Sequence, residues 1–298
     1  MLFRSISYGD LSFLPTVSEF PEETEFQYLF TFDDTDLYLT STPTELEGIE
    51  FAHLGDIRRL SMLDKHQVFL LMTALQLYNW YKDNKYCGRC GTPTVHHPKE
   101  RALTCPKCFR NIYPRILPAV IVAVTYNGKI LLTKYAPISG QSYPYYALVA
   151  GFVEIGETLE ECVQREVMEE TGLAVKNIRY YKSQPWGIVD DLLMGFYCEV
   201  DLEAQEALLK DELPQPLALQ AKLERDDDRS LMDENGDPKV RLDPNELKTG
   251  VWLPPEEMTL QPDAYSLTNE MMLLFKAEKV HEPGELPLPY TREDIELL

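Results

Sequence analysis

The residues from 151 to 173 combine a sharply bounded helix with a high density of carboxylates, and no other segment limits the fold as strongly. Thr158 and Glu161 have the spacing of a capping box, which predicts that a helix begins after Thr158. Gly172 stands where helices commonly end in a left-handed glycine. At about 100° per residue, one face of this helix carries an apolar stripe formed by Leu159, Cys162, Val163 and Val167.

Three glutamates share a face of the same helix. Glu166, Glu169 and Glu170 are related by spacings of three and four residues, and their face overlaps the apolar stripe. We therefore expect all three carboxylates to point into the protein, where they would repel each other and resist desolvation. Bound Mg²⁺ or Mn²⁺ would remove this conflict, because both ions prefer oxygen ligands. Taken alone, a Glu-x-x-Glu-Glu sequence is more often a solvated acidic face.

The flanking residues change that interpretation. The segment fits Gly-x5-Glu-x7-Arg-Glu-apolar-x-Glu-Glu-x-Gly-apolar without a mismatch, and this resembles the Nudix box. The resemblance implies an α/β/α sandwich and the hydrolysis of a nucleoside diphosphate linked to another group. It also implies catalytic roles, with metal ligands at Glu166, Glu169 and Glu170, a supporting carboxylate at Glu157 and an orienting guanidinium at Arg165.

Two Cys-x-x-Cys pairs, separated by 14 residues, predict a metal site. Four thiolates at this spacing suit tetrahedral zinc, and they leave no open position for water, so the ion would be structural. Two disulfides or an iron–sulfur cluster are the alternatives. The expected zinc ligands are Cys87, Cys90, Cys105 and Cys108.

The chain divides into three predicted parts of one α/β protein. Residues 1–85 form a small α+β N-terminal domain, with strands near 28–32 and 36–40 and a helix over 64–80. Residues 86–115 form the zinc ribbon. Residues 116–298 form the Nudix catalytic domain, in which Asn127-Gly128 separates two β-rich runs as in a hairpin.

An acidic, proline-containing insertion interrupts the catalytic domain at about 203–239. We expect it to be largely solvated, with one short helix, and a role in binding a partner is an alternative. Apolar periodicity returns at Val240, and residues 271–279 have the pattern of a last helix.

Further segments are similar to the zinc-ribbon NADH pyrophosphatase family. They are Asn111–Pro118, Ala150–Glu154 and Ser183-Gln-Pro-Trp186, followed by Leu193-Met194. The resemblance implies cleavage of NADH or NAD⁺ to NMN(H) and AMP. The family's Pro-Phe-Pro after the tryptophan is replaced by Gly187-Ile-Val, which removes an aromatic face. ADP-ribose, FAD, dinucleoside polyphosphates or NAD-capped RNA are therefore alternative substrates.

The same resemblance implies a substrate site and a homodimer. Aromatic rings at Tyr113 and Phe152 would stack on adenine, one from each subunit, and core packing is their alternative role. The remaining implied residues are Gln184 and Trp186 in the signature, Thr268 beside the base, and Glu246 as a further Mg²⁺ or Mn²⁺ ligand.

The formal net charge of −21 bears on partners and location. Such a surface repels nucleic-acid backbones and anionic membranes, so we expect neither as a partner, NAD-capped RNA excepted. No run of about 18 apolar residues and no signal-peptide pattern is present, which predicts a cytoplasmic protein. A non-catalytic nucleotide sensor is the contrasting hypothesis, and it would bind a ligand without turnover.

Overall fold

The computed structural model describes residues 2–3, 14–32, 34–40, 46, 50–51, 65–137, 144–261 and 265–277. The chain forms two compact units. The first comprises residues 1–116 together with the hairpin tip Trp186–Asp191, and the second comprises Leu117–Pro185 and Leu192–Leu298. No described helix has the length and apolarity needed to cross a bilayer.

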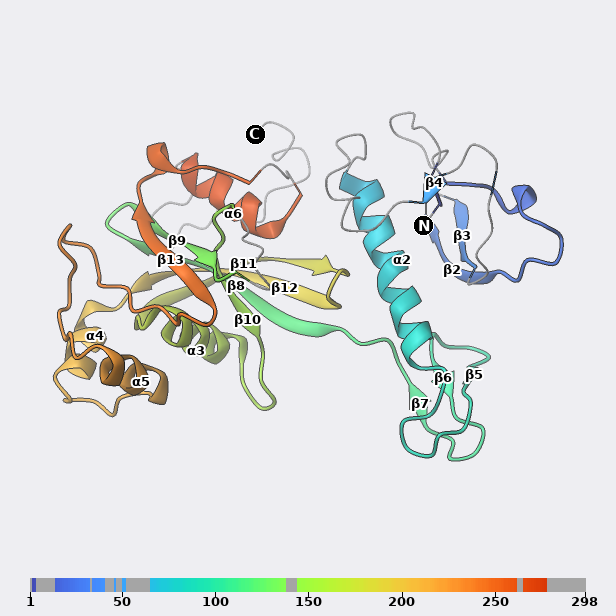
Figure 1. Ribbon diagram of the computed structural model, residues 1–298, viewed down its shortest axis with the longest axis horizontal. Helices are drawn as coiled ribbons and strands as arrows, with labels where there is room; N and C mark the ends of the chain where they lie inside the picture. The colour runs from blue at the N-terminus through green and yellow to red at the C-terminus, as the bar shows by residue number, and fades with distance from the viewer. Residues whose placement is uncertain are drawn as a thin grey trace. The chain divides into compact units, whose positions relative to one another are not determined.

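The first unit contains short strands and one long helix (Figure 1). Strands β1 (Leu2–Phe3) and β4 (Glu50–Phe51) pair, as do β2 (Gln27–Phe32) and β3 (Thr35–Leu39), and a 3-10 turn, η1, spans Val17–Glu19. Helix α2 (Lys65–Asp83) follows, which confirms the predicted helix. The predicted strands near 28–32 and 36–40 are confirmed by β2 and β3.

A three-stranded sheet completes this unit. It consists of β5 (Val95–His96), β6 (Leu103–Thr104) and β7 (Asn111–Ile112), in that order. A small core joins it to α2 and β2, because the buried side chains of one cluster come from all three parts, namely Leu29, Ala74, Leu77, Trp80 and Leu103.

The second unit is built on a six-stranded sheet. Its order is β11 (Val175–Trp186), β12 (Asp191–Val200), β8 (Leu117–Tyr126), β9 (Lys129–Tyr135) and β13 (Leu247–Leu253), while β10 (Val149–Phe152) also pairs with β8. Asn127 and Gly128 have φ of 46° and 74°, as a type I′ turn requires, so the predicted hairpin is confirmed.

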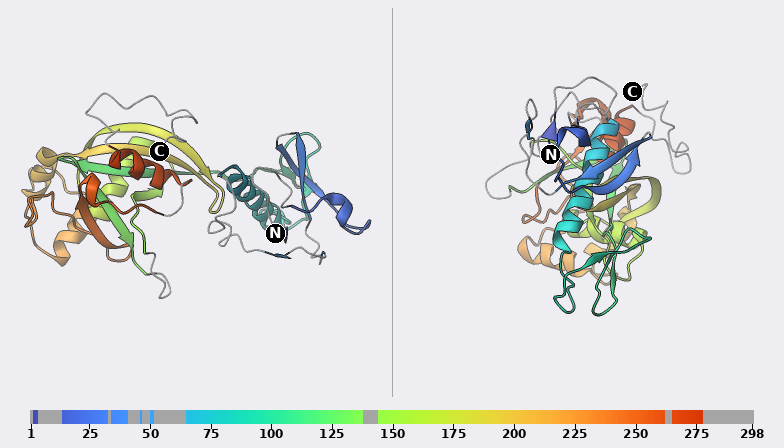
Figure 2. Two further views of the ribbon diagram at one scale, coloured as in Figure 1. Left: turned by 90° about the horizontal axis from the view of Figure 1, so that it is seen from above. Right: turned by 90° about the vertical axis from the view of Figure 1, so that its right-hand side faces the viewer.

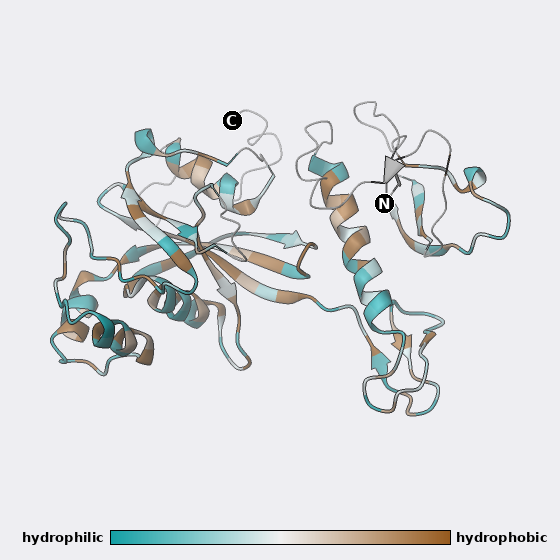
Figure 3. Ribbon diagram, viewed as in Figure 1, coloured by the Kyte–Doolittle hydropathy of each residue, from teal (hydrophilic) through white to brown (hydrophobic). Residues whose placement is uncertain are grey.

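Helices cover both faces of this sheet (Figures 1 and 2). Helix α3 (Leu159–Thr171) packs on β8 and β10, and α6 (Leu267–Lys276) packs on β8 from the other side. Strand β8 is buried on both faces and hydrophobic along its middle, whereas α3 is mostly hydrophilic (Figure 3). The α/β/α sandwich is thereby confirmed. Helix α6 begins four residues before the predicted start, and residues 278–279 lie outside the described residues.

The insertion is more ordered than its composition predicts. It forms two helices rather than one, α4 (Leu202–Leu209) and α5 (Leu217–Arg225), and α5 packs against α3. Its leucines share a buried cluster with Met168 of α3. The expectation of one short helix was wrong, whereas more than half of the residues from 203 to 239 are exposed, as expected of a largely solvated segment. After the insertion the chain returns to the sheet at β13, which the 3-10 turn η2 (Pro255–Glu257) follows.

Candidate active site

The ends of α3 are fixed by local contacts that the sequence predicts. Thr158 accepts a hydrogen bond from the amide of Glu161, whose side chain in turn accepts from the amide of Thr158. At the other end Gly172 has φ of 71°, the left-handed conformation of a C-terminal cap. Helix α3 therefore includes all three glutamates, and they are separated by three and four residues within one continuous helix.

The three glutamates of α3 do not all point inward, which corrects the expectation from the helical spacing. Glu166 and Glu170 are 8% and 3% exposed. The side chain of Glu169 is 47% exposed and lies at the edge of the buried face. Positions 169 and 170 are separated by about 100° around the helix. Only one of them can face the sheet, and the packing selects Glu170.

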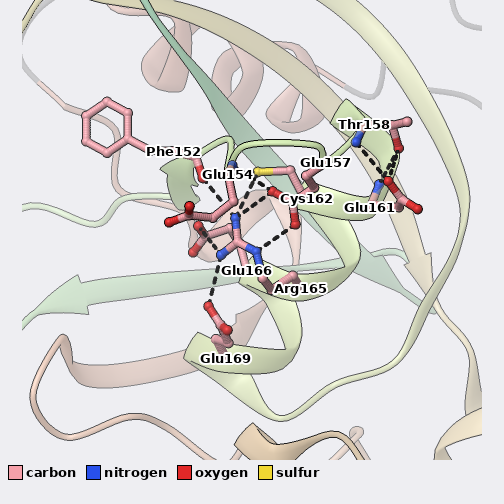
Figure 4. A network of polar contacts seen from close by, with 9 residues as sticks. All are labelled: Phe152, Glu154, Glu157, Thr158, Glu161, Cys162, Arg165, Glu166 and Glu169. Atoms are coloured by element: carbon pink, nitrogen blue, oxygen red, sulfur yellow. Dashed lines mark hydrogen bonds and ion pairs between the residues drawn. The ribbon is translucent and has the colours of Figure 1, made fainter.

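A single guanidinium holds four neighbouring groups in place (Figure 4). Arg165 donates through Nε to Glu157 at 2.7 Å, and through Nη1 to Glu166 at 2.7 Å and to Glu169 at 3.0 Å. Its Nη2 donates to the carbonyl oxygen of Phe152 at 2.8 Å. The neighbouring guanidinium lowers the pKa of Glu157 to about 2. Arg165 thus fixes the orientation of three carboxylates at once.

Gly151 lies against the carboxylate of Glu166. A Cβ atom on Gly151 would stand 2.0 Å from the carboxyl carbon of Glu166, far inside any possible contact. The backbone of β10 therefore forms a cradle that only glycine leaves open. This contact explains why residue 151 is glycine, although its backbone φ is not positive and would not itself require one.

The carboxylate of Glu170 lacks a full set of partners. The amide of Ala150 donates to it, but its Oε2 atom is buried without any hydrogen-bond partner. Burial, together with the charges of Glu166 and Glu246, raises the pKa of Glu170 to about 8. An inward carboxylate oxygen with no donor, close to two further carboxylates, fits the oxygen-ligand preference of Mg²⁺ and Mn²⁺.

The segment that carries Glu246 is fastened to the end of α3. The amide of Arg241 donates to the carbonyl of Thr171 at 2.7 Å, and the amide of Asp243 donates to the carbonyl of Glu170 at 2.9 Å. Glu246 is exposed, and its charge acts on both Glu166 and Glu170. The predicted metal ligands therefore come from α3 and from the segment before β13.

Lys222 is a residue of this site that the sequence did not reveal. It lies on α5, is buried, and is subject to the charges of Asp243, Glu246 and Glu170. Its Cδ atom is 3.2 Å from the position of a Cβ on Gly172, at the end of α3. Desolvation lowers the pKa of Lys222 to about 8. A lysine inside an insertion gave no signal that could have predicted this position.

Two of the predicted substrate segments meet. Gln184 is buried at the end of β11 and donates through Nε2 to the carbonyl of Tyr265 at 2.8 Å, next to the segment that carries Thr268. Its Oε1 atom is buried without a hydrogen-bond partner. Thr268 is half-buried in the first turn of α6.

The predicted aromatic residues are accessible to different degrees. Phe152 ends β10 and is 50% exposed. Tyr113 belongs to the first unit, is also largely exposed, and donates through its hydroxyl to Glu100. Trp186 is half-buried. The exposure of Phe152 and Tyr113 argues against core packing, which was their alternative role.

The four cysteines gather into one cluster in the first unit. Sulfur atoms lie 3.6 Å apart for Cys87 and Cys108, 3.5 Å for Cys90 and Cys105, and 3.9 Å for Cys90 and Cys108. These distances match the edge of a tetrahedron about 3.8 Å long around zinc. All four are free thiols, which argues against disulfides.

The ligand atoms of the four cysteines lie closer together than the carboxylate oxygens of the active site. Within the described ranges, the cysteines are the only potential ligand group of at least three residues whose ligand atoms all lie within 4.8 Å of one another. The carboxylates of the active site influence each other electrostatically over longer distances. Like charges are expected to stay apart until a cation joins them.

Comparison with known proteins finds matches to both parts of the chain. The model described as NUDIX domain matches residues 115–275, and the model described as NADH pyrophosphatase zinc ribbon domain matches residues 82–113.

The NAD-capped RNA hydrolase NudC of Haemophilus influenzae (strain PittEE) is 31% identical over 219 residues, which cover 64% of this chain and 82% of that protein. The protein of the same description from Escherichia coli O1:K1 / APEC is 39% identical over 160 residues, covering 53% and 61%. The crystal structure of a NUDIX hydrolase from Nitrosomonas europaea aligns with 67% of this chain and 94% of that chain, at 20% identity and a TM-score of 0.44.

Proposed function

This chain belongs to the Nudix hydrolase family, and we propose on that basis that it hydrolyses the pyrophosphate bond of NADH and NAD⁺. One water would be consumed, and the products would be NMNH or NMN together with AMP. The observation that carries the proposal is the buried, unpartnered oxygen of Glu170 between Glu166 and Glu246. The zinc ribbon and the NAD-related relatives favour this dinucleotide.

The divalent ion would be Mg²⁺ or Mn²⁺, held by Glu166, Glu169, Glu170 and Glu246. When bound, it would neutralise these carboxylates and activate water and the pyrophosphate as a Lewis acid. Four cysteines, Cys87, Cys90, Cys105 and Cys108, would hold a structural zinc ion in the ribbon.

The chain's own groups would prepare the reaction. Arg165 holds Glu157, Glu166 and Glu169 in fixed directions, which reduces the reorganisation needed when substrate binds. A proton from the attacking water would pass to Glu169 or Glu170. Glu169 has the more accessible carboxylate of the two, since its side chain is 47% exposed.

The nucleotide would be held by the exposed rings of Tyr113 and Phe152 and by the segments that carry Gln184, Trp186 and Thr268. Stacking on adenine needs flat, accessible faces, which both rings offer. We propose that the two rings come from different subunits of a homodimer, and that the enzyme acts in the cytoplasm.

The test compares two glutamates of the same helix. Glu170→Gln should lose most of the release of AMP from NADH in the presence of Mn²⁺, because it removes the charge at the unpartnered oxygen. Glu160→Gln makes the same change at an exposed position of α3 and should keep wild-type activity. Equal activity of the wild-type protein and Glu170→Gln would exclude the assignment.

A second candidate is the removal of NAD from the 5′ end of RNA. It is favoured by the relatives, which are described as NAD-capped RNA hydrolases. ADP-ribose, FAD and dinucleoside polyphosphates remain alternatives because the segment after Trp186 departs from the family signature. Rates measured side by side on NADH, ADP-ribose, FAD and an NAD-capped oligonucleotide would rank them.

A further inference from the structure

The tip of the β11–β12 hairpin, Trp186–Asp191, is more buried than loop tips usually are. Such tips run over the surface in most proteins. Here Gly187 and Asp191 are buried, and Trp186 is half-buried. The tip belongs to the first compact unit, which also contains helix α2. The surface that covers the tip therefore has to be sought in that unit.

Helix α2 lies directly against Gly187. A Cβ atom on Gly187 would stand 2.6 Å from the carbonyl oxygen of Met72 and 3.2 Å from Oε1 of Gln76. Real Cβ atoms essentially never come within 3.0 Å of another heavy atom. Met72 is 1% exposed and lies in the middle of α2, so its backbone carbonyl cannot turn aside as a flexible side chain can. Any residue other than glycine at position 187 would therefore push the tip away from the helix.

Polar contacts through Arg115 attach the tip to α2 a second time. Gln76 donates through Nε2 to the carbonyl of Arg115 at 2.9 Å, and the guanidinium of Arg115 pairs with Asp190 at 3.3 Å. Asp190 has φ of 66°, a conformation in which aspartate is one of the favoured residues. The ion pair adds little stability, because the side chain of Arg115 is 68% exposed. Together with the close contact at Gly187, it fixes the direction of the tip.

The contact with α2 gives a physical reason for the departure from the family signature. The signature has proline directly after the tryptophan, where this chain has Gly187. A proline would bring a Cβ and a ring against the carbonyl of Met72. Prolines stiffen a loop from within, because each fixes its own φ. In this chain the loop has lost those prolines, and it is held from outside by a helix.

We infer that α2 positions the substrate-binding segment of this chain, by holding Gly187 against Met72 and thereby fixing the adjacent Trp186 for contact with the dinucleotide. This role rests on the proposed function, which places Trp186 at the nucleotide. It also assigns a task to residues 1–85, none of which the proposed function uses. Gly187 and Gln76 are positioning residues, since they act on the substrate through Trp186 and do not touch the reacting groups.

The experiment uses the full-length, zinc-loaded protein and compares the wild type with Gly187→Ala. The matched control is Val189→Ala, which changes a side chain of the same tip that is 51% exposed. Three quantities would be measured for each protein. They are kcat and KM for release of AMP from NADH with Mn²⁺, the affinity for NADH without Mg²⁺ or Mn²⁺ from the fluorescence of NADH, and amide hydrogen exchange in the tip.

Gly187→Ala should raise KM about tenfold and leave kcat within about twofold, because it weakens a contact that substrate and transition state share. Stacking of a base on an aromatic ring contributes about five- to a hundredfold to affinity, and a displaced Trp186 would lose part of it. NADH should bind more weakly by the same factor without the divalent ion. Exchange should become faster in the tip and stay slow in α3. Val189→Ala should resemble the wild type in all three measurements.

A second variant removes an attachment without a steric clash. Asp190→Asn breaks the ion pair with Arg115 and keeps a residue that tolerates φ of 66°. It should raise KM about twofold, as the loss of an exposed ion pair allows. This variant keeps the inference testable if Gly187→Ala fails to fold.

Two results would overturn the inference. Faster exchange in the tip of Gly187→Ala with an unchanged KM would show that the contact serves stability alone. Exchange as slow as in the wild type would show that α2 does not hold the tip. Failure of the proposed function looks different, since the wild type itself would then release no AMP from NADH, while exchange would still report whether the tip is docked.

Discussion

Gly151 is required by a side-chain contact rather than by its own backbone conformation. Its Cα faces the carboxylate of Glu166, which Arg165 holds from the other side. We expect Gly151→Ala to push this carboxylate out of place. Since a displacement of about 1 Å in a catalytic group can cost on the order of 100-fold, AMP release from NADH should fall by about that factor.

The control for this prediction is Gly88→Ala. A Cβ there meets nothing within 4 Å, so the variant should keep its activity. Measurement of kcat and melting temperature for both variants would separate displacement of Glu166 from general destabilisation. Full activity in Gly151→Ala would mean that the carboxylate moves without consequence.

Asp191 is a buried acid outside the catalytic group. It is 7% exposed, one of its carboxylate oxygens has no hydrogen-bond partner, and desolvation with the nearby charge of Asp190 raises its pKa to about 6. The folded protein therefore binds more protons than the unfolded chain between about pH 4 and pH 6. Its contribution to the free energy of unfolding falls as pH rises through that window.

We expect Asp191→Asn to raise the free energy of unfolding by about 1–3 kcal/mol at pH 8 and to change it little at pH 4. Urea unfolding of the wild type and the variant at both pH values would measure the difference. Asp83→Asn, at an exposed position, should show no such dependence on pH. A stabilisation of the same size at pH 4 would contradict the electrostatic explanation.

At the scale of single residues, the sequence predicted the features that depend on contacts between residues close together in the chain. The capping box of Thr158 and Glu161 and the cap at Gly172 involve contacts over three or four residues, and both are confirmed. The exposure of Glu169 was not predictable, because either edge of the helix could have faced the sheet. Packing of α3 against β8 and β10 decides it, because Glu170 takes the buried position.

At the scale of whole elements, the insertion contributes to the active site. Helix α5 packs on α3 and carries Lys222 to the carboxylate cluster. Composition hid this role, since the six aspartates and three prolines of residues 203–239 favoured a solvated loop although the segment also holds seven leucines. Only the structure shows that Leu219 and Leu223 share a cluster with Met168 of α3. The helical spacing of the apolar residues in α2 and the Asn-Gly hairpin, in contrast, were sufficient for prediction.

Lys222→Met should increase the affinity of the site for Mn²⁺. The variant removes a positive charge near Glu170, Asp243 and Glu246, and such a charge opposes a cation by about 1 kcal/mol when water screens two charges about 4 Å apart. We therefore expect a roughly fivefold lower dissociation constant in isothermal titration calorimetry. Lys222→Arg keeps the charge and should resemble the wild type. An unchanged or higher dissociation constant in Lys222→Met would show that the lysine does not oppose the cation.

At the scale of the molecule, the two sites lie in different compact units. The cysteine cluster belongs to the first unit and the carboxylate cluster to the second. The sequence predicted both sites because each rests on a regular spacing of a few residue types. The total charge of −21 was a poor guide to the ribbon, because it averages a basic segment, with eight basic and two acidic residues in 82–116, and an acidic remainder.

Removal of zinc should therefore act on one unit only. The ribbon has short strands and a small core, and zinc contributes about 10–16 kcal/mol to the folding of comparable small modules. We expect about one zinc per chain by elemental analysis. Chelation, or Cys105→Ser, should speed amide hydrogen exchange in residues 86–115 and leave peptides of α3 and β8 protected.

Added zinc should restore protection in the chelated wild type but not in Cys105→Ser. Unchanged exchange in the ribbon after complete removal of zinc would show that the metal does not hold this fold together.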